Sequence, residues 1–330
     1  MIDGGTAMEG VTVEEHDFVT LVGAGGGAAE SLSAARDLRA EDPSATYRIA
    51  ALCLHVATAQ PELLVPVYDG LTEGWLGTAP EAEPPAAVGK PADPVPVGED
   101  VWAALWSLVH DPDAGRDPAD ITVRTAAVAG LLPGELSLRV AATALGYPGV
   151  QQAAGTGTPP RFSLAALAAC PRDSLGGHLH ALVVDDGFDL EVLDRDALGL
   201  DALPPPLDYL NVRILQCHDV WHTVAGYETT GLHEVAISGF QMGQFGHHYS
   251  SLFLAMVLTK VAFTQPFEGF GFLLDTILAA YRHGRETPPL LGVDWESIWD
   301  RPVEAIREGL GVRPFDSPYP AGLLEELRSA

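Results

Sequence analysis

Two histidines and two acidic residues in the C-terminal half of this 330-residue chain are spaced in a pattern suited to metal binding. His218 and His222 are four residues apart, so on a helix their imidazoles project from one face. Asp219 flanks that face, three residues before His222. Glu234 follows His222 after eleven residues, and an antiparallel return of the chain would aim it back at the histidines. Two imidazoles with one or two carboxylates suit Zn²⁺, and equally Fe²⁺ or Mn²⁺.

These residues also have other interpretations. The chain contains 11 histidines, so two of them can be four residues apart by chance, without binding a metal. Asp219 can instead be an outer partner that holds a histidine ring, and Cys217 points about 100° away on a helix, as a buried apolar residue would. Three further histidines are candidates for extra ligands, although solvated or buried side chains are the favoured interpretation: His233, His247 and His248.

Apolar residues recur at helical spacing along most of the chain. We therefore expect the candidate ligands to be carried by helices. The helix that carries the histidines is expected to end near Gly226, and the next to begin near Glu234, where the helix dipole favours an acidic residue. No segment has the sustained alternation of a strand, so we predict a mainly α fold. The expected helical segments are 14–76, Val101–Val109, Thr122–Leu145, Phe162–Ala169, Leu175–Val184, Tyr209–Ala225, Glu234–Phe263, Phe272–Arg282 and Pro302–Leu310.

One proline-rich segment divides the chain. Residues 79–99 contain six prolines and almost no bulky apolar residue, which predicts an exposed, extended linker that a protease cuts first. The predicted parts are an N-terminal helical region (1–78), this linker (79–99), a metal-binding helical domain (100–315) and a C-terminal tail (316–330). The glycine-rich run at 23–28 fits a dinucleotide-binding fingerprint formally, but the next apolar segment reads as a helix, which favours a turn between helices.

Composition limits the classes of partner. With 18 Lys+Arg against 45 Asp+Glu the net charge is −27, which opposes binding to nucleic acid and to an anionic membrane surface. Three widely spaced cysteines without a CxxC pair exclude a disulfide framework and indicate a reducing compartment. The first ten residues do not resemble a signal peptide, and no apolar run reaches the ~18–20 residues of a membrane span. We therefore expect a cytoplasmic protein, at most peripheral to the inner face of the membrane, and a homo-oligomer is compatible with these features.

The motif around the histidines resembles the signature of the coenzyme Q (ubiquinone) biosynthesis protein 4 family. The resemblance includes HDVWHTVAGY at 218–227, the eleven-residue gap to Glu234, and Arg213 at a position where the family often has arginine. It extends to the closing segment YRHGRETPPLLGVDWESIWDRPVEAIREGLGV (281–312) and to RDSLGGHLHALVVDDGFDLEVL (172–193), so that it covers about residues 100–315. The chain departs from the family pattern at His233, where glycine is usual, and residues 1–78 have no counterpart in it.

Membership in this family implies a function as well as a fold. The resemblance implies a helical domain that holds a divalent metal, most often zinc, at His218, Asp219, His222 and Glu234, which would also be the catalytic residues. It implies a metal-dependent lyase step in quinone biosynthesis, namely decarboxylation, with or without hydroxylation, of a polyprenylated 4-hydroxybenzoate. The implied partners are this prenylated aromatic or another lipid-like molecule, and other quinone-biosynthesis proteins.

Two questions about the substrate stay open in the sequence. The apolar stretch 250–278 lines a tunnel for a prenyl tail or forms a buried central helix, and the helix is favoured. Next to it, the two arginines of the predicted substrate site either clamp an anionic head group or cap a helix; the residues of that site are Tyr281, Arg282, Arg285, Phe270 and Phe272. A non-catalytic lipid-binding scaffold and a relative recruited to another secondary-metabolite pathway are the alternative functions.

Overall fold

A computed structural model describes residues 13–86, 91–114, 118–155, 157–190, 195–196, 198–265 and 267–329. Throughout these residues the regular elements are helices, and the only strand-like pairing is one isolated bridge between Ser174 and Pro302. The prediction of a mainly α fold is therefore confirmed. Each of the four predicted segments has residues outside the described ones: 1–12 of the N-terminal region, 87–90 of the linker, 115–117, 156, 191–194, 197 and 266 of the metal-binding domain, and 330 of the tail.

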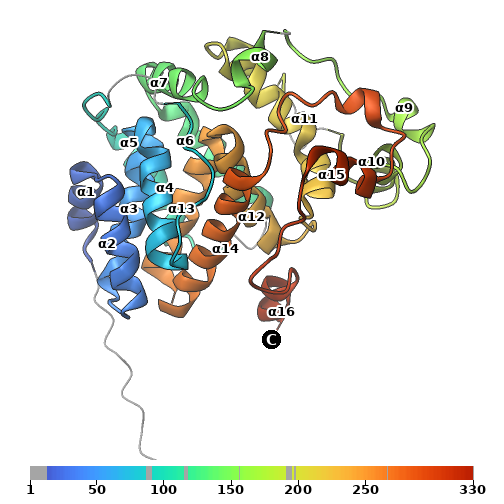
Figure 1. The fold of residues 1–330 in the computed structure, drawn as a ribbon. Coiled ribbons are helices and arrows are strands. Elements are labelled where there is room, and N and C mark those ends of the chain that lie inside the picture. Colours follow the sequence, from blue (N-terminus) through green and yellow to red (C-terminus); the bar gives the residue numbers. More distant parts are fainter. Residues whose placement is uncertain are drawn as a thin grey trace, which may run out of the picture.

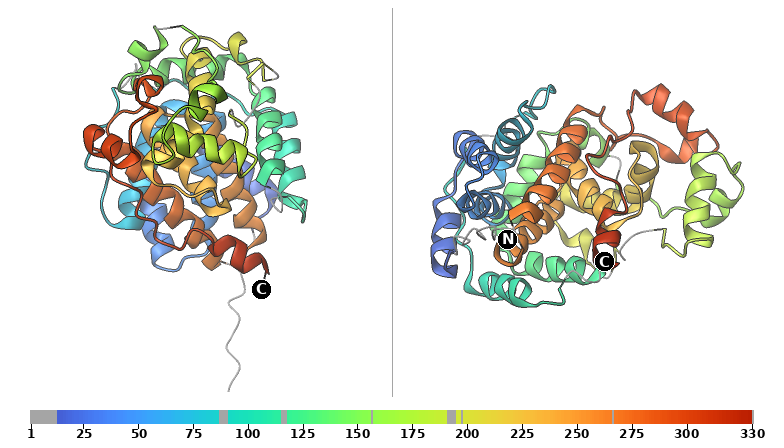
Figure 2. Two further views of the ribbon diagram at one scale, coloured as in Figure 1. Left: turned by 90° about the vertical axis from the view of Figure 1, so that its right-hand side faces the viewer. Right: turned by 90° about the horizontal axis from the view of Figure 1, so that it is seen from below.

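The N-terminal helices share a hydrophobic core with helices from the far end of the chain. Figure 1 places α1–α4 side by side with α13 and α14, and the two views of Figure 2 agree. The helices of this first core are α1 (Glu15–Ala24), α2 (Ala28–Arg39), α3 (Ser44–Thr58), α4 (Leu64–Leu76), α5 (Glu99–His110), α6 (Pro118–Leu131), α13 (His248–Thr264) and α14 (Phe267–Glu286), with the 3₁₀ turn η1 (Pro61–Leu63) before α4. Residues 13–76 therefore share this core with helices from the C-terminal half of the chain.

A second hydrophobic core is formed mainly by residues from the middle of the chain and from its closing segment. α12 (Gly231–Phe245) and α14 run between the two cores and contribute side chains to both. The other elements around this second core are α7 (Gly134–Ala144), α8 (Val150–Ala154), α9 (Leu164–Ala168), α10 (Leu175–Val184), η2 (Leu200–Ala202), α11 (Leu207–Ala225), η3 (Trp295–Ile298) and α15 (Val303–Leu310). The helix α12, which carries Glu234, is thus fixed from two sides.

Two helices expected to be continuous are each split in the structure. The segment Thr122–Leu145 breaks before Gly134, since Pro133 has no N–H to donate to a helix. The segment Glu234–Phe263 breaks at Gly246, whose φ of 61° places it in the left-handed region at the end of α12. At residues 23–28 the favoured turn is found between α1 and α2, and the next apolar segment forms α3, so the strand–helix–strand unit of a dinucleotide site is missing from residues 13–58.

The described parts of the proline-rich segment are extended and held against the helices. Ala86 donates its N–H to the Gly146 carbonyl (3.0 Å), and Val95, only 6% exposed, donates to the Ala59 carbonyl (2.9 Å). The tail is not featureless either, because it contains α16 (Leu323–Ser329). Glu325 accepts a hydrogen bond from the N–H of Gly231 (2.8 Å), so α16 is docked at the beginning of α12.

The apolar stretch 250–278 forms most of α13 and the first half of α14. Leu252, Leu254, Met256 and Leu258 are fully buried, as expected for a central helix packed on nearly all sides. No helix within the described ranges combines the length and the apolar character needed to cross a membrane. These residues therefore supply the centre of the first core.

Candidate metal centre

The end of α11 and the start of α12 bring three of the four predicted ligands together. His218 and His222 project from one face of α11, which ends at Gly226 (φ 81°), a left-handed position that glycine adopts without strain. The chain then turns, and Glu234 lies in the first turn of α12. The Nε2 atoms of His218 and His222 lie 3.0 Å apart, and each is 3.3 Å from an oxygen of the Glu234 carboxylate.

These separations suit a bound ion. Two ligand atoms that bind one metal at about 2.0–2.1 Å lie roughly 2.9–3.4 Å apart for octahedral to tetrahedral angles. The carboxylate of Asp219 completes a group with His218 and His222 in which the ligand atoms all lie within 4.8 Å of one another. The side chain of His222 is 2% exposed and that of Glu234 is 37% exposed, so a ligand could approach from the Glu234 side. The residues present therefore fit a divalent metal.

A backbone contact fixes the orientation of His222. Its Nδ1 lies 3.2 Å from the carbonyl oxygen of Tyr227, to which it donates. Tyr227 is itself held by stacking on Phe315 (centroids 4.6 Å apart) and by a 2.7 Å hydrogen bond from its hydroxyl group to Nδ1 of His283. With its proton on Nδ1, His222 keeps the lone pair on Nε2 that a metal would bind.

A buried polar group supports His218 from behind. The Nε2 amide of Gln241 lies 3.0 Å from Nδ1 of His218, and its Oε1 lies 3.2 Å from Nδ1 of His247 and 3.1 Å from the hydroxyl of Ser250. Gln241 was not among the site residues predicted from the sequence. Its position seven residues after Glu234 could have indicated it, because that spacing places both side chains on one face of a helix. Such outer partners orient a ligand ring and set its tautomer.

Charge is concentrated in the ligand cluster. Burial opposes ionisation of Glu234, but the two histidines outweigh burial and hold its pKa well below the usual range. Burial likewise opposes protonation of His218, and the adjacent Glu234 carboxylate outweighs it, so that the pKa of His218 is raised. Burial raises the pKa of Asp219. The Glu234 carboxylate beside two imidazoles is thus stabilised by positive charge, which protons or a divalent cation can supply.

Comparison with known proteins identifies this region. Residues 159–316, which include all four predicted ligands, match the family model of coenzyme Q (ubiquinone) biosynthesis protein Coq4. The matching segment, just under half of this chain, is similar to the Coq4 family. The curated relatives include the mitochondrial COQ4 homologs of Rattus norvegicus, 31% identical over 170 residues, and of Drosophila ananassae, 28% identical over 150 residues.

The similarity is partial on both sides. The rat match covers 47% of this chain and 58% of the relative, and the Drosophila ananassae match covers 44% and 53%. The chain thus spans little more than half the length of these relatives, which are named as mitochondrial proteins. A crystal structure of a candidate ubiquinone biosynthesis protein from Nostoc punctiforme PCC 73102 is 24% identical, with a TM-score of 0.48, and is covered over 97% of its chain and 64% of this one.

Two motif positions of the Coq4 segment meet in an ion pair. Arg213 of α11 donates to both carboxylate oxygens of Glu296 (2.9 and 3.0 Å) and to the carbonyl of Val293 (3.2 Å). Val293 and Glu296 belong to the VDWE run, 80 and 83 residues further along the chain. The closing segment therefore anchors α11, one helical turn before the histidines begin.

The predicted substrate residues contact other parts of the protein. Arg285 and Tyr281 both donate to Asp69 of α4 (2.5 and 2.8 Å), and Arg282 donates to Thr78 (3.3 Å). Phe270 is 1% exposed in the first core, and Phe272 lies against Tyr319 with ring centroids 4.6 Å apart. The contacts found for these five side chains join α14 to the N-terminal helices and the tail rather than to the histidine cluster.

The remaining histidines and Cys217 have structural surroundings. Cys217 is fully buried in the second core, as expected. Nδ1 of His233 accepts the N–H of Glu228 (2.8 Å), and Nε2 of His248 donates to the carbonyl of Ala57 (2.7 Å). His247 reaches the cluster only through Gln241. Among the described residues, the group able to hold a metal is His218, Asp219 and His222, with Glu234 in contact with both histidines.

Proposed function

We propose that this protein binds a divalent metal through His218, His222 and Glu234, with Asp219 as a fourth ligand, and acts in the biosynthesis of ubiquinone or a related prenylated aromatic compound. The observation that carries the proposal is the Glu234 carboxylate, whose two oxygens each lie 3.3 Å from a different histidine Nε2. This arrangement lies within the segment that matches Coq4. Zn²⁺ is the preferred ion, and the donors also suit Fe²⁺ or Mn²⁺.

The proposed reaction is decarboxylation of a prenylated 4-hydroxybenzoate. A bound metal would act as a Lewis acid toward the substrate carboxylate. The bond between the ring and the carboxylate breaks, CO₂ leaves, and the electron pair stays on the ring carbon, where a proton replaces the carboxylate. In the oxidative variant, dioxygen and water are co-reactants: the acid, O₂ and water give the phenol, CO₂ and hydrogen peroxide. His222 and Glu234 would hold the reacting end, since the exposed edge of Glu234 is the accessible side of the cluster.

Metal content tests the ligand assignment first. Wild-type protein purified without chelator should contain about one transition metal per chain by elemental analysis. His222→Ala and Glu234→Gln should lose it while keeping the helical circular dichroism signal. His178→Ala is the matched control, because His178 is exposed on α10 and lies outside the cluster. If the wild-type protein binds none of Zn²⁺, Fe²⁺ and Mn²⁺ when these ions are added, the metal centre is excluded.

Product formation then tests the reaction. Metal-loaded protein is incubated with geranylated 4-hydroxybenzoate labelled at the carboxylate carbon, with and without dioxygen. Labelled CO₂ that depends on His222 supports decarboxylation, and a requirement for dioxygen with hydrogen peroxide as co-product supports the oxidative variant. Full metal occupancy with no release of CO₂ under either condition would reject the enzyme and favour a scaffold that only binds prenylated intermediates.

A further inference from the structure

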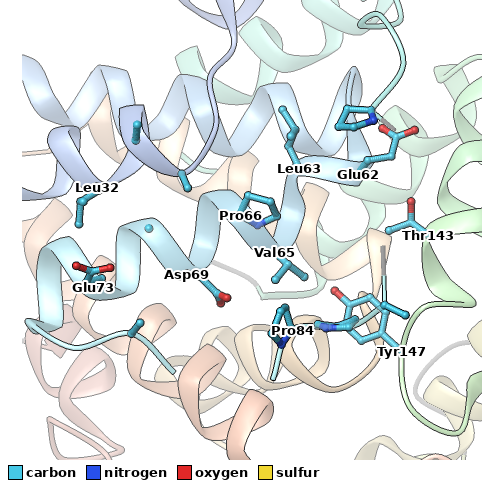
Figure 3. Close-up of a pocket in the computed structure, with 17 residues that line it drawn as sticks. Leu32, Glu62, Leu63, Val65, Pro66, Asp69, Glu73, Pro84, Thr143 and Tyr147 are labelled. Atoms are coloured by element: carbon cyan, nitrogen blue, oxygen red, sulfur yellow. The ribbon is translucent and has the colours of Figure 1, made fainter. Parts of the chain in front are cut away.

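A cavity of about 650 Å³ is lined by residues of the N-terminal half of the chain, and none of the predicted metal ligands is among them. It is bounded by α2, α4, the end of α7 and the proline-rich segment, as Figure 3 shows. Every residue lining it falls between Ala28 and Tyr147, and therefore before the segment that matches Coq4. Its volume is within the range of roughly 300–1,000 Å³ that is usual for small-molecule sites.

The wall of the cavity is mainly apolar. Leucine, valine, alanine and proline side chains make up most of it, including Leu32, Leu63, Val65, Pro66 and Pro84. Apolar lining with a few fixed polar groups is typical of sites that bind small organic molecules. The proline-rich segment forms part of this wall through Pro84, Pro85 and Pro91, so it contributes to the cavity itself.

Three carboxylates at the cavity are paired with arginines. Arg139 donates to both oxygens of Glu62 (2.7 Å each), Arg285 donates to Asp69 (2.5 Å), and Arg36 lies 3.6 Å from Glu73. None of these arginines lines the cavity, and the described lining contains no basic side chain. Along the described lining an anionic ligand would therefore meet three carboxylates and no basic side chain, which disfavours it electrostatically.

One buried hydroxyl group of the lining has no partner. Tyr147 is 3% exposed, and its hydroxyl forms no hydrogen bond with any described residue. Figure 3 shows this oxygen on the side of the ring toward Val65 and Pro84, two residues that line the cavity. The ring is fixed by contact with Gly246, where a Cβ would overlap it. A buried donor without an acceptor is costly, and a ligand oxygen at this position would satisfy it.

A hydrogen-bonded group keeps the polar side of the cavity in place. Asp69 accepts from Tyr281 (2.8 Å) and from Arg285, and Arg285 also donates to the Ala82 carbonyl of the proline-rich segment (3.1 Å). These contacts join α4, α14 and residues 79–86. The cavity is thus supported by polar groups that are already paired, and Tyr147 is the donor left for a ligand.

From these observations we infer that this cavity is a second ligand site, separate from the metal centre, for an uncharged and mostly apolar small molecule that carries one hydrogen-bond acceptor. The volume and the lining set its size and apolar character, the carboxylates exclude acids, and Tyr147 selects the acceptor. The inference does not depend on the metal or on the proposed reaction.

Two fluorescent probes of different charge test the site. Nile red is uncharged and has a carbonyl acceptor, whereas 8-anilinonaphthalene-1-sulfonate carries a negative charge. Full-length protein should bind Nile red with a stoichiometry of one per chain and should not bind the sulfonate at this site. Val65→Trp places a large side chain in the cavity and should weaken Nile red binding at least tenfold. Thr143→Phe does the same from α7 and is a second variant in case the first folds poorly.

Matched variants separate the cavity from general surface binding. Leu138→Trp adds the same side chain at a 62% exposed position of α7 and should leave binding unchanged. Tyr147→Phe should weaken binding about two- to tenfold, the loss of one hydrogen bond, without lowering the unfolding temperature. Unchanged Nile red binding in both cavity variants, or no binding by the wild-type protein, would overturn the site. Sulfonate binding that Val65→Trp abolishes would overturn the exclusion of acids, and an unaltered affinity in Tyr147→Phe would overturn the role of its hydroxyl.

Discussion

The side-chain amide of Gln241 contacts Nδ1 of His218 at 3.0 Å, on the side of the ring away from His222 and Glu234. In this arrangement the amide N–H donates, so His218 carries its proton on Nε2, the atom that faces His222 and Glu234. A metal on Nε2 requires the proton on Nδ1 instead. The amide can serve both states, because exchanging its oxygen and nitrogen turns Gln241 into the acceptor and lets it donate to His247 and Ser250.

The first prediction follows from this adaptable partner. Gln241→Met preserves the length of the side chain but removes its hydrogen bonds to His218, His247 and Ser250. We expect metal affinity to fall about 10- to 100-fold, the usual cost of losing an outer partner of a histidine ligand. Competition with a chromogenic chelator measures this affinity.

Gln244→Met is the control for the first prediction. Gln244 is buried on the same helix, but it bonds the backbone of Gly284, Thr287 and Leu290. It should lose stability and keep its affinity for metal. Equal affinities for the wild-type protein and Gln241→Met would show that the amide does not position His218.

The second prediction concerns acid sensitivity, which originates in His247. Burial lowers the pKa of His247 to about 3, and the positive charges of His248 and His218 add to this. In the unfolded chain a histidine has a pKa of about 6.5. Between these values the unfolded state binds a proton that the folded state does not, so the free energy of unfolding falls as pH falls, by up to about 1.4 kcal/mol per pH unit for this one group.

Urea denaturation between pH 7.5 and pH 5 measures this slope, with chelator present so that metal release does not contribute. Below pH 6, the free energy of unfolding of His247→Gln should depend less steeply on pH than that of the wild-type protein, by the contribution of one histidine. His178→Gln, at an exposed position of α10, should leave the slope as it is in the wild-type protein. A slope that is the same in His247→Gln and wild type would contradict the assignment to His247.

The meeting of His218, His222 and Glu234 could be predicted from sequence because its geometry is local. His218 and His222 are one helical turn apart, and the eleven residues before Glu234 hold the end of α11, a turn and the first turn of α12. Within so short a segment, helical periodicity and one glycine at the end of α11 determine which side chains meet. The position of Gln241 follows from the same periodicity, seven residues after Glu234.

The contacts of α14 could not be predicted in the same way. Arg285 and Tyr281 meet Asp69, which is 216 and 212 residues away along the chain, and no local pattern encodes that pairing. The proline-rich segment was expected to separate two regions, because its composition indicates an extended chain. It is extended, but composition does not show that it packs against neighbouring helices or that residues on both sides share a core.

The third prediction concerns the crossing of α12 and α14, which holds Glu234 in place relative to both cores. Gly284 of α14 faces the backbone of Phe240, and a Cβ at Gly284 would overlap the Phe240 carbonyl oxygen and lie 3.0 Å from its Cα. From the other side, a Cβ at Gly239 would lie 2.7 Å from the carbonyl oxygen of Ile277. The two helices therefore approach with backbone against backbone, as only glycine permits.

Gly284→Ala should force these helices apart and lower the free energy of unfolding by about 1–3 kcal/mol, the usual cost of overpacking a core. Gly130→Ala is the matched control, since Gly130 lies in α6 with nothing within 4 Å of an added Cβ. There the methyl group should be neutral or stabilise the helix by up to about 1 kcal/mol. Urea denaturation of both variants at pH 7.5 decides the matter. If Gly284→Ala is as stable as Gly130→Ala, the close approach of α12 and α14 is not needed to hold the fold, and Glu234 must be positioned by the turn before α12 alone.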